Sequence, residues 1–225
     1  MKPRIKLTET TTPDGGIVGL YERDGAFSIS FSGQELMHSQ ASASETLLGR
    51  VTVERLRGSA NEHVLIGGLG LGFTLRSALD AVSKDCIVEV AELIPSIVDW
   101  NRTFLRKLNG TCLDDPRVHI RIEDVATLIR NASPATYSAI ALDVDNGPIA
   151  MVAAGNFHLY SATGLQAIKA ALTPGGRAVF WSAGPDAKFE SRLRKAGFKV
   201  KAVPAKVYEG AKRAAYILFV ADLIG

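Results

Sequence analysis

Val64-Leu-Ile-Gly-Gly-Leu-Gly-Leu-Gly-Phe-Thr74 joins an apolar run to a turn with four glycines in six residues: Gly67, Gly68, Gly70 and Gly72. Glycines at a strand-to-helix turn let the backbone pass close to a ligand, and the helix start presents free N–H groups. The dinucleotide pattern G-x-G-x-x-G fails here, because its last position falls on Phe73 or Leu75. The turn therefore favours a nucleoside without a pyrophosphate. The alternative is a turn that needs glycine only for packing.

Short apolar runs and helical stretches alternate on both sides of this turn. The apolar runs are His63–Ile66, Cys86–Val90, Val118–Arg121, Ser138–Leu142, Ala178–Trp181, Phe198–Ala202 and Ala215–Val220. The helical stretches lie near residues 73–83, 94–107, 123–131, 156–172 and 186–195, and Pro174-Gly175-Gly176 ends the fourth. This alternation predicts right-handed crossovers onto a mainly parallel, seven-stranded, doubly wound Rossmann-like sheet. No convincing helix precedes the last run, so we expect the final strand to enter antiparallel.

The first 45 residues follow a different pattern. Phe27, Ile29 and Phe31 alternate with serines, which is typical of a half-buried strand. Asp24-Gly25 precedes that strand and suits a tight hairpin turn, and Ser32-Gly33 offers a second reversal. We therefore expect a small antiparallel β meander over residues 1–45 and a nucleoside-binding α/β domain over residues 46–225.

The composition excludes several classes of protein. Lys and Arg number 26 against 23 Asp and Glu, and this small, scattered excess does not indicate nucleic acid as a partner. No apolar stretch is long enough to span a membrane, and residues 1–20 lack a secretory signal, so we expect a cytoplasmic protein. The four histidines are far apart and the two cysteines read as core fillers, so no metal site is expected. Apolar edges of the meander favour a homodimer.

Acidic residues follow the second and third strands of the predicted sheet. Glu92 lies 20 residues after Gly72, where a doubly wound fold places an acid on ribose hydroxyls. Glu123 and Asp124 follow the next strand, where an acid can accept a hydrogen bond from an adenine amino group. Asp124 is equally suited to cap the helix that begins there. These acids extend the predicted nucleoside site beyond the glycine turn.

More polar residues follow the fourth strand. Asp143, Asp145 and Asn146 point into the crevice where open α/β sheets bind ligands, beyond the carboxyl ends of the strands. An acid there can hold a cationic amine or take its proton, although acids also suit an Asn-Gly-Pro turn. Tyr160 follows this loop and is predicted to line an acceptor pocket. Trp181 ends the fifth strand, where core packing is the more common role.

With these motifs in place, the chain resembles the spermidine synthase family, within the class I S-adenosylmethionine-dependent methyltransferases. The resemblance runs from about Gly16 to Ala221. It rests on the glycine turn, on Val90-Ala-Glu-Leu-Ile-Pro95, on Asp115-Pro-Arg-Val-His-Ile-Arg-Ile-Glu-Asp124, on Tyr137-Ser-Ala-Ile-Ala-Leu-Asp143 and on Leu172-Thr-Pro-Gly-Gly176. The short N-terminal meander with Glu45 also looks like that family's β domain, trimmed.

The resemblance implies a transferase that uses S-adenosylmethionine or its decarboxylated form as co-substrate and alkylates a small, amine-bearing acceptor. The catalytic candidates are then Asp143 and Asp145, with Asn146 and Tyr160 on the acceptor side. Two family positions differ: the acid of the glycine loop is matched to Leu71, and a tyrosine to Ala43. The alternatives are a small-molecule methyltransferase and a catalytically quiet adenosyl-binding protein of the same fold.

Overall fold

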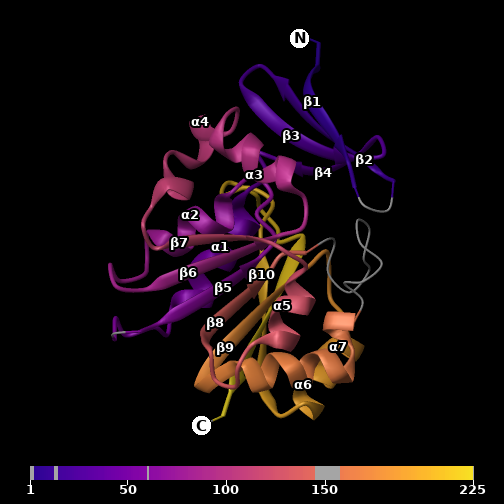
Figure 1. Ribbon diagram of the computed structural model, residues 1–225. Coiled ribbons are helices and arrows are strands. Elements are labelled where there is room, and N and C mark those ends of the chain that lie inside the picture. The colour runs from indigo at the N-terminus through magenta and orange to yellow at the C-terminus, as the bar shows by residue number, and fades with distance from the viewer. Residues whose placement is uncertain (1–2, 13–14, 60, 145–157, 225) are drawn as a thin grey trace.

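The computed structural model describes residues 3–12, 15–59, 61–144 and 158–224, which form a small antiparallel sheet and a larger, mainly parallel one (Figure 1). The strands are β1 (Ile5–Thr11), β2 (Ile17–Arg23), β3 (Ala26–Phe31), β4 (Gln34–His38), β5 (His63–Gly67), β6 (Ile87–Glu92), β7 (Val118–Ile122), β8 (Tyr137–Leu142), β9 (Leu172–Ser182), β10 (Phe198–Ala205) and β11 (Tyr216–Leu223). The helices are α1 (Ala43–Val53), α2 (Phe73–Leu79), α3 (Pro95–Arg102), α4 (Arg106–Asn109), α5 (Val125–Asn131), α6 (Ala162–Ala171) and α7 (Ala187–Lys195), with a 3-10 turn at Cys112–Asp114. Within the described residues, no helix is both long and apolar enough to cross a membrane.

The larger sheet confirms the predicted architecture. Its strand order is β10-β11-β9-β8-β5-β6-β7, and the strands from β9 to β7 pair in parallel. The last strand, β11, lies antiparallel to both β9 and β10, as expected. The chain runs outward from β5 through β6 to β7 and then returns to β8 on the other side of β5. The order therefore reverses between β5 and β8, which is the point where such sheets bind ligands.

Each face of the larger sheet packs against its own set of helices. Val64 and Ile66 of β5 join a core with α1, α2 and α3, while Leu65 between them joins a core with α5, α6 and α7. Successive side chains of a strand point to opposite faces, so a strand covered on both sides must be apolar throughout. This explains why the apolar runs of the central strands β5 and β8 lack polar alternation. Figure 1 shows the two helical layers on either side of the sheet.

The N-terminal sheet has the order β1-β2-β3-β4 and lies beyond the carboxyl ends of β5 and β6 (Figure 1). Both predicted reversals are present. Asp24 and Gly25 have φ values of 50° and 81°, and Ser32 and Gly33 have values of 46° and 87°. Such left-handed pairs form the tight turns that match the twist of antiparallel strands. Strand β1 was not predicted, so the meander has four strands.

Several helix predictions need correction. The stretch 94–107 contains two helices, α3 and α4, because the chain leaves helical geometry at Thr103. Helix α6 ends at Ala171, so Pro174-Gly175-Gly176 does not end it and lies within β9 instead. The register of β8 and β9 shifts between Tyr137 and Ala139, which accommodates those residues as a bulge. Helix α1 was not predicted.

Candidate active site

A cavity of about 600 Å³ opens at the carboxyl ends of β5, β6, β7 and β8. The small N-terminal sheet forms its opposite wall, so residues far apart in the chain meet there. The residues that line it are Val18, Ile29, Glu35, Leu36, Met37, His38, Ala41, Ser44, Glu45, Gly68, Gly70, Ala91, Glu92, Leu93, Ile94, Ile97, Glu123, Asp124, Val125, Asp143, Val144, Trp181, Ala183 and Tyr216. Its volume falls within the range of small-molecule and cofactor sites.

The glycine turn forms part of this wall, but its four glycines have two different roles. Gly68 and Gly70 line the cavity and have φ values of 90° and 51°, which other residues rarely adopt. Gly67 does not line the cavity, and a Cβ there would lie 2.9 Å from Leu142 and from Val125. The same holds for Gly72, whose Cβ would lie 2.9 Å from Asn101 Oδ1. Packing therefore favours glycine at all four positions, since a Cβ would also lie 2.4 Å from Asp143 O at Gly68 and 2.6 Å from Met37 Sδ at Gly70. Only Gly68 and Gly70 face the cavity as well.

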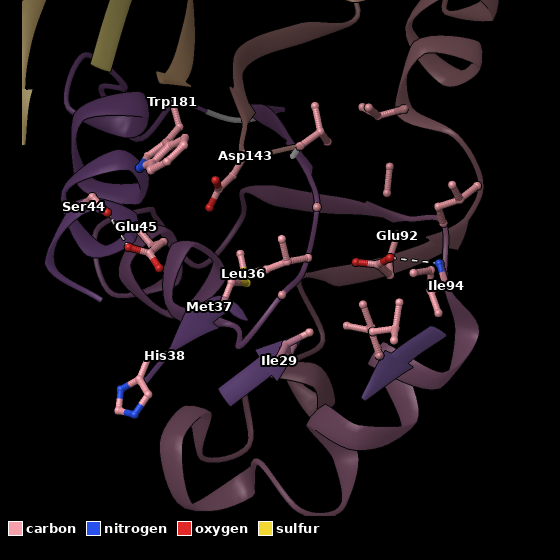
Figure 2. Close-up of a pocket in the computed structure, with 18 of the residues that line it drawn as sticks. Ile29, Leu36, Met37, His38, Ser44, Glu45, Glu92, Ile94, Asp143 and Trp181 are labelled. Atoms are coloured by element: carbon pink, nitrogen blue, oxygen red, sulfur yellow. Dashed lines mark hydrogen bonds between the residues drawn. The ribbon is translucent and has the colours of Figure 1, made fainter. Parts of the chain in front are cut away.

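Glu92 lies at one end of the cavity and joins two backbone segments. Its Oε2 accepts a hydrogen bond from the Leu69 backbone N–H at 3.0 Å. Its Oε1 accepts one from the Ile94 backbone N–H at 2.9 Å (Figure 2). The side chain is 6% exposed, and burial raises the pKa of its carboxyl group although these N–H groups oppose the shift. A carboxylate has about four lone-pair positions, so Glu92 can still accept from ligand hydroxyls.

Asp124 and Glu123 line the same part of the cavity. Asp124 is the N-cap of α5, and its Oδ1 accepts from the Thr127 backbone N–H at 2.7 Å. The predicted capping role of Asp124 is therefore confirmed. The cap uses Oδ1, so Oδ2 can accept a hydrogen bond from a ligand in the cavity. Glu123 forms an ion pair with Arg121 at 3.5 Å.

Asp143 and Glu45 lie at the other end of the cavity. Figure 2 shows their carboxyl groups pointing into the same space beside the Trp181 indole, away from Glu92. Asp143 directly follows β8, and its backbone N–H donates to Gly67 O at 3.0 Å, which fixes it beside the glycine turn. Glu45 belongs to the first turn of α1 and accepts from Ser44 Oγ at 2.5 Å. Burial raises the pKa of the Glu45 carboxyl group.

Trp181 and Tyr216 complete this end of the cavity. Their rings lie 4.8 Å apart, and Trp181 Nε1 is buried without a hydrogen-bond partner among the described residues. The sequence favoured a core role for Trp181, but the structure places it in the wall. Burial, and then the charge of Glu45, raise the pKa of the Tyr216 hydroxyl. The role of Tyr216 was missed, since an aromatic residue that begins a strand carries no local sign of a cavity.

Two positions singled out in the sequence are core residues in the structure, and two others cannot be placed. Tyr160 is 2% exposed and packs in the core against Phe180 and Phe189, so it does not line the acceptor side of the cavity. Its hydroxyl donates to Val144 O at 3.4 Å, behind the wall. Leu71 is also a core residue, so the turn positions that face the cavity are Gly68 and Gly70. The candidates Asp145 and Asn146 lie outside the described residues.

The charge of this cavity has a single sign. Among the described residues that line it, six are acidic and none is Lys or Arg. The acidic residues are Glu35, Glu45, Glu92, Glu123, Asp124 and Asp143. Residues 145–157, which follow Asp143 in the chain, also include no Lys or Arg. Such a cavity attracts cations and repels anions, because low-dielectric walls focus the field of the carboxylates.

The spermine/spermidine synthase domain model matches residues 41–192, which contain the glycine turn and all the acids that follow the strands. The chain belongs to this family. A polyamine aminopropyltransferase of Mycobacterium tuberculosis is 32% identical over 145 residues, which are 61% of this chain and 27% of that protein. The chain thus covers about a quarter of the length of that relative. A putrescine N-methyltransferase of Nicotiana tabacum is 34% identical over 117 residues, 51% of this chain and 29% of that protein.

Solved structures of this family share the fold. The spermidine synthase of Thermotoga maritima has a TM-score of 0.71 at 18% identity, over 98% of this chain and 73% of that chain. A spermidine synthase in complex with the transition-state analogue AdoDATO has a TM-score of 0.69 at 18% identity, over 98% of this chain and 72% of that chain. The likeness extends beyond the matched domain and covers the small N-terminal sheet as well as the larger one.

Proposed function

We propose that this chain is a transferase that moves an aminopropyl group from decarboxylated S-adenosylmethionine to a small amine. The family supports a transferase, and the mycobacterial relative is named a polyamine aminopropyltransferase. The observation that carries the proposal is the charge of the cavity, whose described wall holds six acids and no Lys or Arg. A sulfonium ion and an amine are both cations in water, and both suit such a site.

The same observation selects between the two forms of the co-substrate. S-adenosylmethionine carries an α-carboxylate, which would enter an acidic cavity without a basic side chain to pair with it. Burying an unpaired charge among like charges is costly. The decarboxylated form lacks that group and carries only positive charge on its tail. We therefore favour it as the donor.

The roles of the residues follow from their places along the cavity. Glu92 binds the ribose hydroxyls, and Asp124 with Glu123 accepts from the adenine amino group. Gly68 and Gly70 allow the nucleoside to approach the backbone. A nucleoside held at that end directs its sulfonium toward Asp143. Asp145 and Asn146 remain predicted members of the acceptor side.

The reaction needs a neutral amine aligned with the carbon–sulfur bond. The amine nitrogen forms a new bond to the sulfonium-bound carbon, and the electron pair of the broken bond goes to sulfur, leaving a neutral thioether. Asp143 holds the incoming ammonium group and takes the proton that the nitrogen loses. Alignment of the two reactants in a closed site contributes up to about 7–11 kcal/mol. The face of the Trp181 indole provides a cation–π surface for the acceptor.

Methyl transfer to an amine is the second candidate, because the relative from Nicotiana tabacum is named a putrescine N-methyltransferase. The two functions are separated by incubating the protein with each co-substrate and a panel of mono-, di- and triamines. Mass spectrometry of the products identifies the group that was added. We expect aminopropylated amine and methylthioadenosine. Methylated amine would establish the second candidate, and ligand binding without any product would indicate a catalytically quiet member of the family.

A further inference from the structure

The proposed donor carries positive charge at two places, the sulfonium sulfur and the amino group at the end of its aminopropyl chain. An alkylamine of this kind is an ammonium ion at neutral pH. Burying that ion in the cavity is costly unless a carboxylate pairs with it. The glycine turn, residues 67–73, contains no acidic residue, so the carboxylate must come from another segment of the wall.

The first turn of α1 lies beside the start of α2, which directly follows the glycine turn. Glu45 belongs to that first turn, and its backbone O accepts a hydrogen bond from Thr74 Oγ1 of α2 at 3.3 Å. Gly49, one turn farther along α1, allows this close approach, because a Cβ there would lie 2.4 Å from Thr74 O. The packing of the two helices therefore holds the main chain of Glu45 beside the end of the glycine turn.

The carboxyl group of Glu45 is held on one side and open to the cavity on the other. Its Oε2 accepts from Ser44 Oγ at 2.5 Å, and Ser44 itself is 1% exposed. Figure 2 shows the other carboxyl oxygen, Oε1, pointing away from Ser44 into the cavity. Glu45 is half-buried, and burial raises the pKa of its carboxyl group. An ammonium partner would offset the cost of burying this carboxylate, because a charge-assisted hydrogen bond favours its ionised form.

Asp143 and Glu45 give this end of the cavity one carboxyl group for each amine of the proposed reaction (Figure 2). Asp143 has to accept the proton that the acceptor nitrogen loses. A carboxylate that is paired with the donor ammonium is a weaker base, because the positive charge favours its ionised form. We propose that Glu45 binds the terminal ammonium group of the donor and leaves Asp143 to the acceptor amine. This assignment rests on the proposed function, and it makes Glu45 the residue that selects a donor with a positively charged tail.

Two neutral thioethers test the assignment by binding alone. Decarboxylated S-adenosylhomocysteine keeps the aminopropyl chain, and propylthioadenosine lacks only its amino group. In calorimetric titrations of the wild type, we expect the amine to bind about tenfold more tightly. In Glu45→Gln this preference should fall below about threefold, while propylthioadenosine binds as before and shows that the site is intact. Asp143→Asn and the exposed control Glu209→Gln should both keep the wild-type preference.

Steady-state kinetics separate this role from one on the acceptor side. Glu45→Gln should raise KM for the decarboxylated donor about tenfold and leave KM for the acceptor amine unchanged. A raised KM for a diamine acceptor with an unchanged donor preference would overturn the proposal, since Glu45 would then bind the far end of the acceptor.

The binding data alone can also overturn the proposal. Equal affinity of the wild type for the two thioethers would do so, as would a preference that survives in Glu45→Gln or is lost in Asp143→Asn instead. Formation of aminopropylated product alongside any of these results would leave the proposed function standing. Failure of both thioethers to bind would contradict the nucleoside site of the proposed function together with this assignment.

Discussion

Asp143 follows β8 where the strand order reverses, and its main chain is held against the glycine turn. A Cβ at Gly68 would lie 2.4 Å from Asp143 O, so only glycine allows the two segments to approach this closely. The main chain of Asp143 thus has a fixed position at the end of the cavity where its carboxyl group points into the same space as that of Glu45 (Figure 2). An acid fixed in this way is suited to hold an amine and accept its proton.

Replacing Asp143 with Asn tests this role directly. We expect the turnover number for amine alkylation to fall by about 10²–10⁴, because the general base is lost. Binding of the nucleoside donor should change by less than threefold, since Glu92 and Asp124 remain. Steady-state kinetics and calorimetry measure the two effects. Asp99→Asn, at an exposed position of α3, is the matched control. Unchanged turnover in Asp143→Asn would remove Asp143 from the mechanism.

Glu45 makes the stability of the unliganded protein depend on pH. Burial raises its pKa above the ordinary value of 4.5, so the folded state binds its proton more tightly than the unfolded state. The contribution of Glu45 to the free energy of unfolding therefore decreases as the pH rises from about 4.5 through the folded-state pKa. The variant Glu45→Gln should lack this decrease. Urea denaturation of both proteins across that pH range measures the difference, and parallel curves would contradict the assignment.

At the scale of elements, Asp124 both caps α5 and lines the cavity, so a change of this side chain affects the stability of the helix and the cavity wall. Asp124→Ala removes the hydrogen bond to Thr127, and we expect a loss of about 1 kcal/mol in the free energy of unfolding. Asp124→Asn keeps a capping oxygen, so its stability should match that of the wild type. If Asp124 also binds the donor, both variants should bind it at least fivefold more weakly. If Asp124→Asn bound the donor with wild-type affinity, Asp124 would cap α5 without binding the donor.

Arg177 connects the end of α1 to strands β9 and β11 of the larger sheet. Arg177 of β9 is 8% exposed, binds Asp222 of β11 at 2.7 and 3.3 Å, and donates to Val51 O at 2.8 Å. Burial opposes ionisation of Asp222, but Arg177 and Arg55 outweigh it and lower the pKa of its carboxyl group. Stability from this group is present above the ordinary pKa of 3.8 and is lost as the pH falls through the lower, folded-state value.

Asp222→Asn leaves the buried Arg177 with one carboxylate partner. We expect a loss near the lower end of ~3–5 kcal/mol in the free energy of unfolding at pH 7, because Asp222 itself remains 22% exposed. The loss should shrink in acid, where the wild-type carboxylate is protonated as well. Denaturant titrations at neutral and acid pH measure both values. Equal stability of the two proteins at pH 7 would show that the link contributes nothing.

The sequence predicted elements whose pattern is local and missed those whose fit depends on distant partners. Helix α1 contains Gly49 and ends in Thr52 and Val53, so its helical pattern is weak. Gly49 is needed because a Cβ there would lie 2.4 Å from Thr74 O of α2. This contact exists only after the two helices pack. In contrast, the apolar runs of the larger sheet were recognised, since burial on both faces leaves a continuous signal in the chain.

The residues of the candidate site fall into the same two groups, those that the sequence identifies and those that depend on distant partners. Glu92 and Asp143 could be found from the sequence, because the carboxyl ends of parallel strands always meet at one edge of the sheet. Tyr216 and Met37 could not, since they reach the cavity only when β11 and β4 are assembled around it. Trp181 also lies at the end of a parallel strand, but an aromatic residue there is more often part of the core. Tyr160 was assigned to the cavity from its closeness in sequence to Asp143. In the folded chain, Tyr160 packs in the core with residues of α6 and α7 instead.

At the scale of the whole molecule, the charge is unevenly distributed. The net charge is +3, yet the described wall of the cavity holds six acidic residues and no Lys or Arg. The small N-terminal sheet supplies part of the wall of this cavity. Its Met37 lies against Gly70 of the glycine turn, where a Cβ would be 2.6 Å from the sulfur. The chain thus provides a covered, acidic space, in keeping with the proposed nucleoside cation and amine.

Calorimetric titration of the purified protein with decarboxylated S-adenosylmethionine and with S-adenosylmethionine itself tests the meaning of this acidic cavity. The two compounds differ by one carboxylate, so their affinities report how the cavity treats a negative charge. We expect the decarboxylated compound to bind at least tenfold more tightly, a difference of about 1.4 kcal/mol or more. Equal or tighter binding of S-adenosylmethionine, or no heat with either compound, would contradict the account.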